Sequence, residues 1–238
     1  MNMRVAELDY ANQEFANELV PIRAANYKKS LKKNMEKVAK RGLDIIGGLV
    51  GVIFLLPLTF AIYIANRVIG DKGPIFYTQQ RIGKNGKLFK MYKYRSMVVG
   101  ADEKLEKYLD ENPEAREEFD TYKKLKNDPR ITKVGKFIRK TSLDEFPQFI
   151  NVLKGDMSLV GPRPYLPREK EDMKYYYPYI VESKPGITGF WQVSGRSEVT
   201  FDDRLNMDFV YSKMKNFKLD VKLLVKTFLN VVKKEGAI

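Results

Sequence analysis

A run without a single charged residue, from Ile45 to Asn66, most constrains what this chain can fold into. Its length is close to the roughly 20 residues that a helix needs to cross the apolar part of a bilayer. Pro57 lies inside the run, and a proline there removes a helical hydrogen bond and bends the helix. Basic residues flank the run on both sides, whereas a straight crossing is expected to carry them mainly on one side. We therefore favour a kinked, re-entrant membrane helix over a spanning helix, and either of these over a buried helix.

The charge balance points to an anionic partner. Among 238 residues there are 43 Lys and Arg against 30 Asp and Glu, which gives a formal net charge of +13. Such an excess suits nucleic acid, anionic lipid headgroups or phosphorylated substrates. A basic group directly before the uncharged run favours anionic lipid, with a solvated helix face as the alternative. Its members are Lys28, Lys29, Lys32, Lys33, Lys37, Lys40 and Arg41.

Two residue types are missing from the chain. It contains no Cys and no His, so disulfides, thiolate chemistry and histidine-based zinc sites are excluded. Any catalysis must use carboxylates, Lys, Arg, Tyr or hydroxyl groups. Carboxylate nucleophiles and hard cations such as Mg²⁺ are then the natural candidates.

The stretch that follows Arg139 contains two adjacent carboxylates, Asp144 and Glu145, just before Pro147. Ser142 and Glu145 have the spacing of a capping box, and proline is tolerated in the first helical turn, so we expect a helix to begin here. The N-terminus of a helix favours a bound anion. The pair is therefore placed to hold phosphate and a divalent cation. The alternative is that one of these carboxylates merely caps the helix.

A β-hairpin is expected after the uncharged run. Residues 75–77 and 88–94 have the composition of short strands, and residues 84–86, Lys-Asn-Gly, form a turn between them. Lys93 and Arg95 alternate with aromatic residues, which places both cations on one face of the strand. The alternative for these two cations is a solvated face.

Two loops rich in Gly and Pro, residues 155–164 and 184–196, each present an arginine. Arg163 lies between two prolines and has little backbone freedom, which suits the bidentate recognition of phosphate by a guanidinium. Arg196 ends the second loop. Asp208 follows as one of several carboxylates in the next segment.

Two further segments have a simpler interpretation. Residues 101–128 are highly charged and helix-prone, and we expect a surface excursion without chemistry. Residues 219–234 alternate apolar side chains with lysines at helical spacing. They predict a basic amphipathic helix that lies at a membrane surface or packs on the domain.

Several long motifs occur in a fixed order: KRxxD before the hydrophobic segment, FYTQQRIGKNGKLFKMYKYRSM, DPRITKVGKFIRKTSLDEFPQFINVLKGDMSLVGPRP and KPGITGFWQVSGR. From about Lys37 to the C-terminus the chain closely resembles the bacterial sugar transferases, the monotopic polyprenyl-phosphate phosphoglycosyl transferases. Long motifs in one order are far more specific than a single short one. The resemblance implies transfer of a sugar phosphate from a UDP-sugar to undecaprenyl phosphate, with release of UMP, in the first membrane step of exopolysaccharide, capsule or glycan synthesis.

The resemblance also implies roles for single residues. Asp144 matches the family nucleophile, which attacks the β-phosphorus and forms a covalent phosphosugar intermediate, and Glu145 matches its Mg²⁺-binding neighbour. A carboxylate can approach two phosphates only when their charge is neutralised, which Mg²⁺ and nearby cations achieve. Positions that line the family's active site are matched by Lys93, Arg139, Arg163 and Asp208, and we add Arg95 and Arg196 as candidates for substrate binding.

The expected architecture is α+β: a small mixed catalytic domain with a re-entrant N-terminal membrane helix and interfacial amphipathic helices. We divide the chain into a basic extension (1–36), a membrane-associated helix (37–69) and a catalytic sugar transferase domain (70–238). The family resemblance implies a place at the cytoplasmic face of the bacterial inner membrane. One departure from the family concerns Pro57, which follows Leu-Leu where many relatives carry Ser-Pro, so no serine can bridge the broken backbone bonds. The sequence leaves the sugar and the oligomeric state open and is compatible with a homo-oligomer.

Two rival functions are weaker. A membrane-attached module that binds anionic lipid by charge alone would leave Asp144 and Glu145 without a purpose. A nucleic-acid-binding protein would suit the net charge of +13, but the chain has no recognition-helix motif and the uncharged run would be out of place. We therefore expect membrane lipids and no nucleic acid among the partners.

Overall fold

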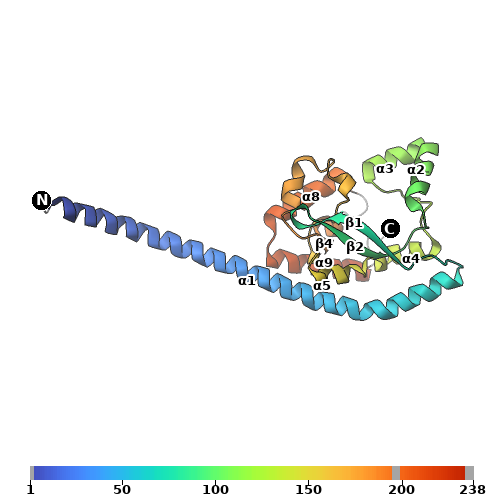
Figure 1. Ribbon diagram of the computed structural model, residues 1–238, viewed down its shortest axis with the longest axis horizontal. Helices are drawn as coiled ribbons and strands as arrows, with labels where there is room; N and C mark the ends of the chain where they lie inside the picture. Colours follow the sequence, from blue (N-terminus) through green and yellow to red (C-terminus); the bar gives the residue numbers. More distant parts are fainter. Residues whose placement is uncertain (1–2, 195–198, 234–238) are drawn as a thin grey trace. The chain divides into compact units, whose positions relative to one another are not determined.

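A computed structural model describes residues 3–194 and 199–233, and the side chains of residues 30–194 and 199–230. The described chain is mostly helical and has two small two-stranded sheets, which confirms the mixed architecture expected from the sequence (Figure 1). By internal contacts it divides into two compact units, residues 1–42 and 43–238. The helices and strands are, in chain order, α1 (Met3–Val68), β1 (Phe76–Ile82), β2 (Leu88–Tyr94), α2 (Ala101–Glu111), α3 (Pro113–Tyr122), α4 (Lys133–Lys140), α5 (Gln148–Lys154), β3 (Ser158–Val160), α6 (Tyr177–Ile180), β4 (Gly186–Thr188), α7 (Phe190–Ser194), α8 (Phe201–Met214) and α9 (Phe217–Lys233).

The uncharged run forms the C-terminal part of α1, as its composition predicts. The stretch Ser30–Val68 is long and apolar enough to cross a membrane. Many of its large apolar side chains are exposed to the surroundings, including Leu56 at 79% and Ile53 at 71%. Such exposure is costly in water and expected in lipid. The helix could therefore span or insert into a membrane, and its re-entrant form stays a prediction.

The helix α1 continues through Pro57. Two hydroxyl groups lie close to the carbonyl oxygen of Leu55, two residues before this proline. Oγ1 of Thr59 donates a hydrogen bond to the carbonyl oxygen of Leu55 over 2.6 Å, and the hydroxyl of Tyr94 lies 3.1 Å from the same oxygen. The two hydroxyls are also 2.6 Å apart. A threonine of the helix and a tyrosine of β2 thus both place hydroxyls at the carbonyl of Leu55, two residues before Pro57.

Glycines let α1 approach the rest of residues 43–238 closely. A Cβ atom at Gly51 would collide with the ring of Phe149, and one at Gly48 would lie 2.7 Å from Cδ2 of Leu153. Both neighbours belong to α5. Because helices in lipid pack through small residues at the interface, this glycine-lined contact is suited to a membrane-associated helix.

The hairpin predicted between residues 75 and 94 is confirmed. β1 and β2 pair antiparallel with Tyr77 opposite Lys93, and the turn contains Asn85 at a φ of 57°. β1 extends further than expected, to Ile82, and β2 ends at Tyr94. Asn151 of α5 caps the free edge of β2, since its Oδ1 accepts from the N–H of Tyr92 over 3.0 Å and its Nδ2 donates to the carbonyl of Lys90 over 2.8 Å.

The predicted capping box is wrong. Ser142 has a φ of 57°, its side chain makes no capping hydrogen bond, and α5 begins only after Pro147. An N-cap residue needs extended backbone, whereas the left-handed conformation of Ser142 is typical of the residue that ends a helix, here α4. Asp144 and Glu145 consequently lie in a short 3₁₀ turn between α4 and α5, and neither is the N-cap of α5.

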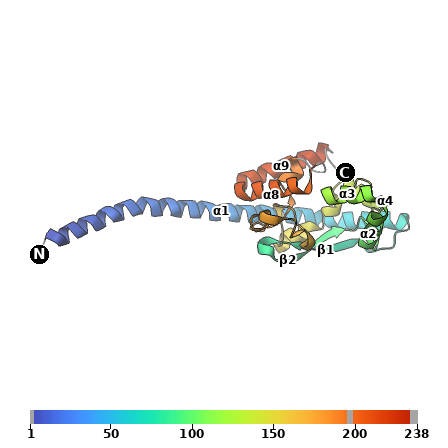
Figure 2. The same cartoon turned by 90° about the horizontal axis from the view of Figure 1, so that it is seen from above.

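The main core of residues 43–238 lies between β2, α5, β3, α8 and α9. Its fully buried members include Met91, Val152, Met157, Val160 and Tyr211. β3 and β4 pair in parallel, and β3 contributes Leu159 and Val160 to this core. In the view of Figure 2, α8 and α9 lie on one side of the apolar part of α1, and the β1–β2 hairpin lies on the other side.

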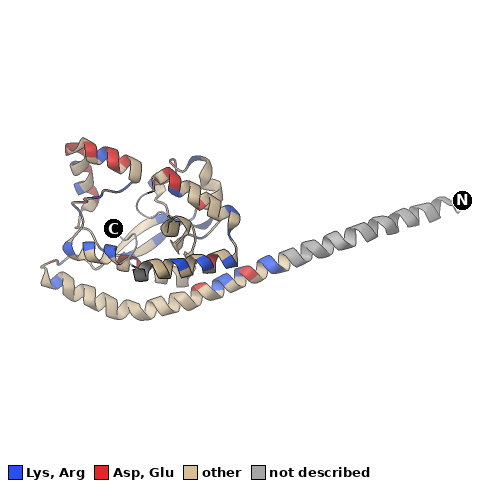
Figure 3. Cartoon of the chain, turned by 180° about the vertical axis from the view of Figure 1, so that it is seen from behind, with Lys and Arg blue, Asp and Glu red and all other residues tan. Residues whose placement is uncertain are grey.

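The segment 101–128 forms the helical pair α2 and α3, with a small hydrophobic cluster of its own made of Leu105, Leu109 and Leu125. Figure 3 shows its acidic residues gathered on these two helices, and basic residues along α4 and α9. α9 exposes Val225 and Phe228 and buries Leu223, so the predicted amphipathic helix is confirmed.

Candidate active site

A lysine of β2 meets both carboxylates of the 3₁₀ turn. Nζ of Lys93 lies 2.8 Å from Oε1 of Glu145 and 3.8 Å from Oδ2 of Asp144. The side chain of Asp144 is 11% exposed and that of Glu145 is 34% exposed. The structure therefore brings three of the predicted site residues together across 52 positions of sequence. The glutamate is the more accessible of the two acids.

The two carboxylates have opposite electrostatic character. Burial raises the pKa of Asp144, and the neighbouring Glu145 adds to this effect, while the cation of Lys93 opposes it. Burial also works to raise the pKa of Glu145, but the charge and hydrogen bond of Lys93 outweigh it and lower that pKa below its usual value. Glu145 is thus the acid held ionised by the protein, whereas Asp144 gains from any additional positive charge in the site.

Arg139 approaches the same turn from the end of α4. Its Nε donates to Oγ of Ser96 over 2.8 Å, which fixes the guanidinium. Burial lowers the pKa of Arg139, and the carboxylates of Asp144 and Asp128 favour its charged form. Arg139 thus interacts electrostatically with Asp144, and its role in substrate binding stays a prediction.

The main chain of Arg163 is held by a hydrogen bond to Asp208. Its N–H donates to Oδ2 of Asp208 over 2.9 Å, and the hydroxyl of Tyr165 donates to the same oxygen over 2.8 Å. Its guanidinium carbon lies 5.9 Å from the ring centre of Trp191, and its charge helps to keep Glu145 ionised. Nε of Arg163 is buried and has no acceptor among the described residues. This N–H of the guanidinium is therefore unsatisfied among the described contacts.

Asp208 contacts the Arg163 loop and not the carboxylate pair. It is 0% exposed, and burial raises its pKa to about 7 although the hydrogen bonds from Arg163 and Tyr165 favour the carboxylate. In the described contacts Asp208 does not touch the carboxylate pair, and its contribution to the site is to support the loop that carries Arg163.

Arg95 has different partners from Lys93. The main-chain N–H of Arg95 still donates to the carbonyl of Ile75 over 2.7 Å just beyond the end of β2, and the expectation that both cations lie on one face stays a prediction. The guanidinium of Arg95 bonds to Oδ1 of Asp71 over 2.7 Å and to the carbonyl of Met97 over 2.9 Å. These contacts are structural, and a direct contact of Arg95 with substrate stays a prediction. Arg196 lies outside the described residues.

Sequence reasoning missed several residues that shape the site. Asn151 fixes the helix after the carboxylate pair against β2, and Arg81 lies buried in β1 with its Nη1 donating to the carbonyl of Pro164 over 2.9 Å. The guanidinium carbon of Arg204 also lies near Trp191, at 5.4 Å from the ring centre. Arg81 is present in the FYTQQRIG motif, but a single arginine in a strand gives no sign of its burial or of its partners.

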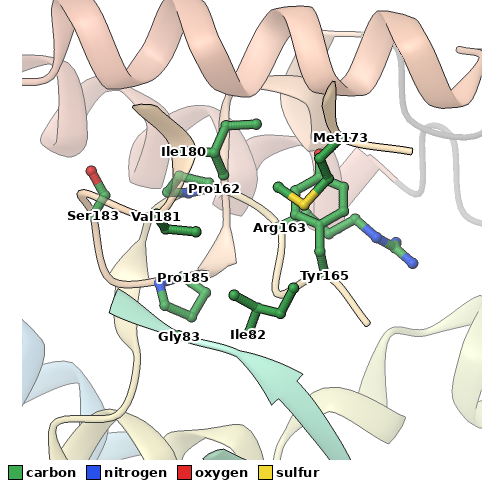
Figure 4. A pocket seen from close by; sticks show the side chains of 10 residues that line it. All are labelled: Ile82, Gly83, Pro162, Arg163, Tyr165, Met173, Ile180, Val181, Ser183 and Pro185. Atoms are coloured by element: carbon green, nitrogen blue, oxygen red, sulfur yellow. The ribbon is translucent and has the colours of Figure 1, made fainter. Parts of the chain in front are cut away.

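A small pocket lies beside the Arg163 loop (Figure 4). Its lining is largely apolar and includes Ile82, Pro162, Met173 and Ile180. Figure 4 shows the side chain of Arg163 extending away from the middle of this pocket. An apolar hollow does not stabilise a charged phosphate, so we do not assign it to the phosphate site.

The carboxylate pair fits Mg²⁺ only together with a phosphorylated ligand. Within residues 30–194 and 199–230, no group of three or more acidic residues could hold a metal ion by itself. Mg²⁺ is commonly held by one or two carboxylates, with substrate phosphates and water completing the shell. Asp144 and Glu145 supply such oxygen donors, and the partly exposed Glu145 is the accessible one.

Comparison with known proteins shows the family to which this chain belongs. The model of the family "Bacterial sugar transferase" matches residues 35–234. The undecaprenyl-phosphate galactose phosphotransferase of Salmonella typhimurium is 46% identical over 223 residues, which cover 94% of this chain and 46% of that protein. The galactosyl transferase CpsE of Streptococcus agalactiae is 42% identical over 212 residues, covering 89% of this chain and 46% of that protein.

A relative of similar length also matches. The exopolysaccharide production protein ExoY of Rhizobium meliloti is 40% identical over 200 residues, covering 84% of this chain and 88% of that protein. The chain therefore spans about half the length of several curated relatives and most of the length of others. Because the family match covers the hairpin, the carboxylate pair and the Arg163 loop, this chain belongs to the bacterial sugar transferase family.

Proposed function

We propose that this protein transfers a sugar phosphate from a UDP-sugar to undecaprenyl phosphate and releases UMP. The observation that carries the proposal is the pairing of Lys93 with two adjacent carboxylates, Asp144 and Glu145, inside a chain of the bacterial sugar transferase family. A partly buried acid beside an ionised acid and a lysine suits covalent phosphoryl transfer. The relatives named for undecaprenyl-phosphate sugar transfer support the choice of lipid acceptor.

The reaction proceeds in two displacements. A carboxylate oxygen of Asp144 attacks the β-phosphorus of the donor, the bond from that phosphorus to the bridging oxygen breaks, and UMP leaves with the electron pair. A phosphate oxygen of undecaprenyl phosphate then attacks the same phosphorus. This second step releases the Asp144 carboxylate and forms the lipid diphosphate sugar, so the enzyme is regenerated.

The cations of the site lower the repulsion between anions. Lys93 and Arg139 act at the Asp144 carboxylate, and Arg163 presents its guanidinium to phosphate oxygens. Glu145, with Asp144, would hold Mg²⁺, which when bound supplies further positive charge to the phosphates. Preorganised charge of this kind is commonly a large contribution to catalysis, because it is in place before the reaction begins.

The membrane helix is explained by the lipid acceptor, because the enzyme must reach a phosphate at the membrane surface. Undecaprenyl phosphate presents its phosphate at the membrane surface, and the apolar part of α1 anchors residues 43–238 to the same surface. The exposed apolar and basic residues of α9 suit the interface with anionic lipid. We place the protein at the cytoplasmic face of the bacterial inner membrane, in the first membrane step of exopolysaccharide or capsule synthesis.

A panel of donors tests the function. Detergent-solubilised protein is incubated with undecaprenyl phosphate, Mg²⁺ and one UDP-sugar at a time, and UMP release is measured. UDP-galactose and UDP-N-acetylgalactosamine are tested first, because the names of relatives contain these sugars. We expect Mg²⁺-dependent UMP release with at least one donor and none from Asp144→Asn. Binding of anionic vesicles without UMP release from any donor would favour the non-catalytic lipid-binding module.

A further inference from the structure

Arg81 is a buried cation that bonds only to neutral groups in the described contacts. It is 8% exposed, and its guanidinium donates to the carbonyl of Pro164 and to Oε1 of Gln79. No acidic side chain of the described residues forms an ion pair with it, and its Nε has no acceptor there. A buried charge without an ionic partner is costly, so packing alone does not explain an arginine at this position.

The contacts of Arg81 lead to the loop that carries Arg163. Its Nη1 lies 2.9 Å from the carbonyl oxygen of Pro164, and the next residue of β1, Ile82, donates its N–H to the carbonyl of Tyr165 over 2.9 Å. Asp208 of α8 also holds this loop, because it accepts hydrogen bonds from the N–H of Arg163 and from the hydroxyl of Tyr165. Three consecutive residues of the loop are therefore held from β1 and from α8.

The charges around Arg81 also connect it with Arg163. Burial and the cation of Arg163 lower the pKa of Arg81 to about 10, and the carboxylates of Glu169 and Glu145 oppose this effect. The cation of Arg163 and the carboxylate of Glu145 thus both interact electrostatically with the guanidinium of Arg81. Like charges repel each other, so a bound anion would relieve this arrangement.

We propose that Arg81 is a positioning residue for phosphate recognition: it holds the Pro164 carbonyl so that the guanidinium of Arg163 faces the phosphate oxygens of a substrate. This inference rests on the proposed function. The phosphate can come from the UDP-sugar or from undecaprenyl phosphate, because both present the same oxygen chemistry to the guanidinium.

A double-mutant cycle tests the link between the two arginines. Arg81→Gln, Arg163→Gln and the double variant are compared with the wild type by UMP release, while the UDP-sugar and undecaprenyl phosphate are varied in turn. We expect each single variant to lose about tenfold or more of kcat/KM, and the double variant to lose little more than Arg163→Gln, because residues that act as a unit are not additive. The substrate whose KM rises most identifies the source of the phosphate.

Controls separate positioning from folding. Arg168 follows the same loop but is exposed, so Arg168→Gln should keep wild-type kinetics. Thermal unfolding of each variant is recorded, and Arg81→Lys replaces Arg81→Gln if the latter does not fold, since lysine keeps the charge but loses the fork. Losses that multiply in the double variant, or an Arg81 variant within about twofold of wild type, would overturn the inference. Absence of UMP release from the wild type with every donor would instead overturn the proposed function.

Discussion

Asp44 of α1 and Ser158 of β3 form a buried hydrogen bond of 2.9 Å between the carboxylate Oδ1 and the serine hydroxyl. The same oxygen accepts the N–H of Leu159 over 2.8 Å. Asp44 is the acidic residue of the KRxxD motif and is 4% exposed. One carboxylate oxygen therefore joins the start of the apolar helical segment to the parallel strand pair.

Replacement of Asp44 should destabilise residues 43–238 more than replacement of its partner. Asp44→Ala leaves two buried donors without an acceptor, at a cost of about 1–3 kcal/mol for each. Ser158→Ala removes one donor and should cost about 1 kcal/mol. Thermal unfolding of the detergent-solubilised variants measures the order. Equal unfolding temperatures of wild type and Asp44→Ala would contradict the anchoring role.

The carboxylate pair should separate into two roles. With the correct UDP-sugar and Mg²⁺, but without lipid acceptor, the wild type should carry a phosphosugar adduct on Asp144. Asp144→Asn keeps the shape but removes the nucleophilic carboxylate, so it should fold, form no adduct and lose at least about a thousandfold in turnover. Glu145→Gln should form the adduct slowly and need more Mg²⁺. Mass spectrometry of the intact proteins measures the adduct.

The outcome that contradicts this mechanism is specific. An adduct on Asp144→Asn, or full turnover by that variant, would show that another group reacts. A variant that fails to unfold cooperatively is not informative, so the unfolding transition of each protein is recorded beside its activity.

The shape of the Arg163 guanidinium should matter as well as its charge. Arg163→Lys keeps the cation but loses the planar fork of donors, so kcat/KM should fall by about tenfold or more, since small errors in positioning are costly. Steady-state UMP release measures the change. Arg168→Lys, at an exposed arginine nearby, serves as the matched control. Near-normal activity of Arg163→Lys would leave the residue with a structural role only.

Asp208 should make stability depend on pH. Its pKa is raised from 3.8 to about 7 by burial, so the folded state holds a proton that the unfolded state releases at lower pH. The stability that this proton contributes is fully present below about pH 4 and is lost as the pH rises through 7, at a slope of at most about 1.4 kcal/mol per pH unit. Asp208→Asn removes the titration.

The comparison is made by unfolding both proteins across that range. Relative to Asp208→Asn, the wild type should lose stability from pH 4 to pH 7 and change little above pH 8. A constant difference between the two proteins across the whole range would show that Asp208 does not titrate in this window.

The topology of α1 can be measured with single cysteines, because the chain has none of its own. A re-entrant helix places both flanks of the uncharged run on the cytoplasmic side. Lys33→Cys and Lys72→Cys should then both be protected from an impermeant thiol reagent in intact cells and react after the membrane is opened. Reaction of one of them from outside would show that the helix spans.

Local composition was sufficient for several elements. The uncharged run predicts a long apolar helix because most of its side chains avoid water. The Asn85-Gly86 pair predicts the hairpin because its backbone needs positive φ. The adjacent carboxylates and the order of motifs indicated the family without knowledge of distances. Each of these signals lies within a short stretch of chain.

Tertiary structure alone decided which charges meet. Lys93 reaches Glu145, whereas Arg95, two residues later, bonds to Asp71 in the segment between α1 and β1. The left-handed backbone of Ser142 ends α4 and so prevents the capping box that its spacing predicts.

The support of the Arg163 loop was likewise invisible in the sequence. Arg81 and Asp208 hold this loop from two elements that lie far apart along the chain. Hydrogen-bond partners at such separations depend on how strands and helices pack, and spacing within one segment contains no information about that packing. The sequence determined the chemistry available to this protein, and the packing of β1, β2 and α8 around the 3₁₀ turn decided which residues share the site.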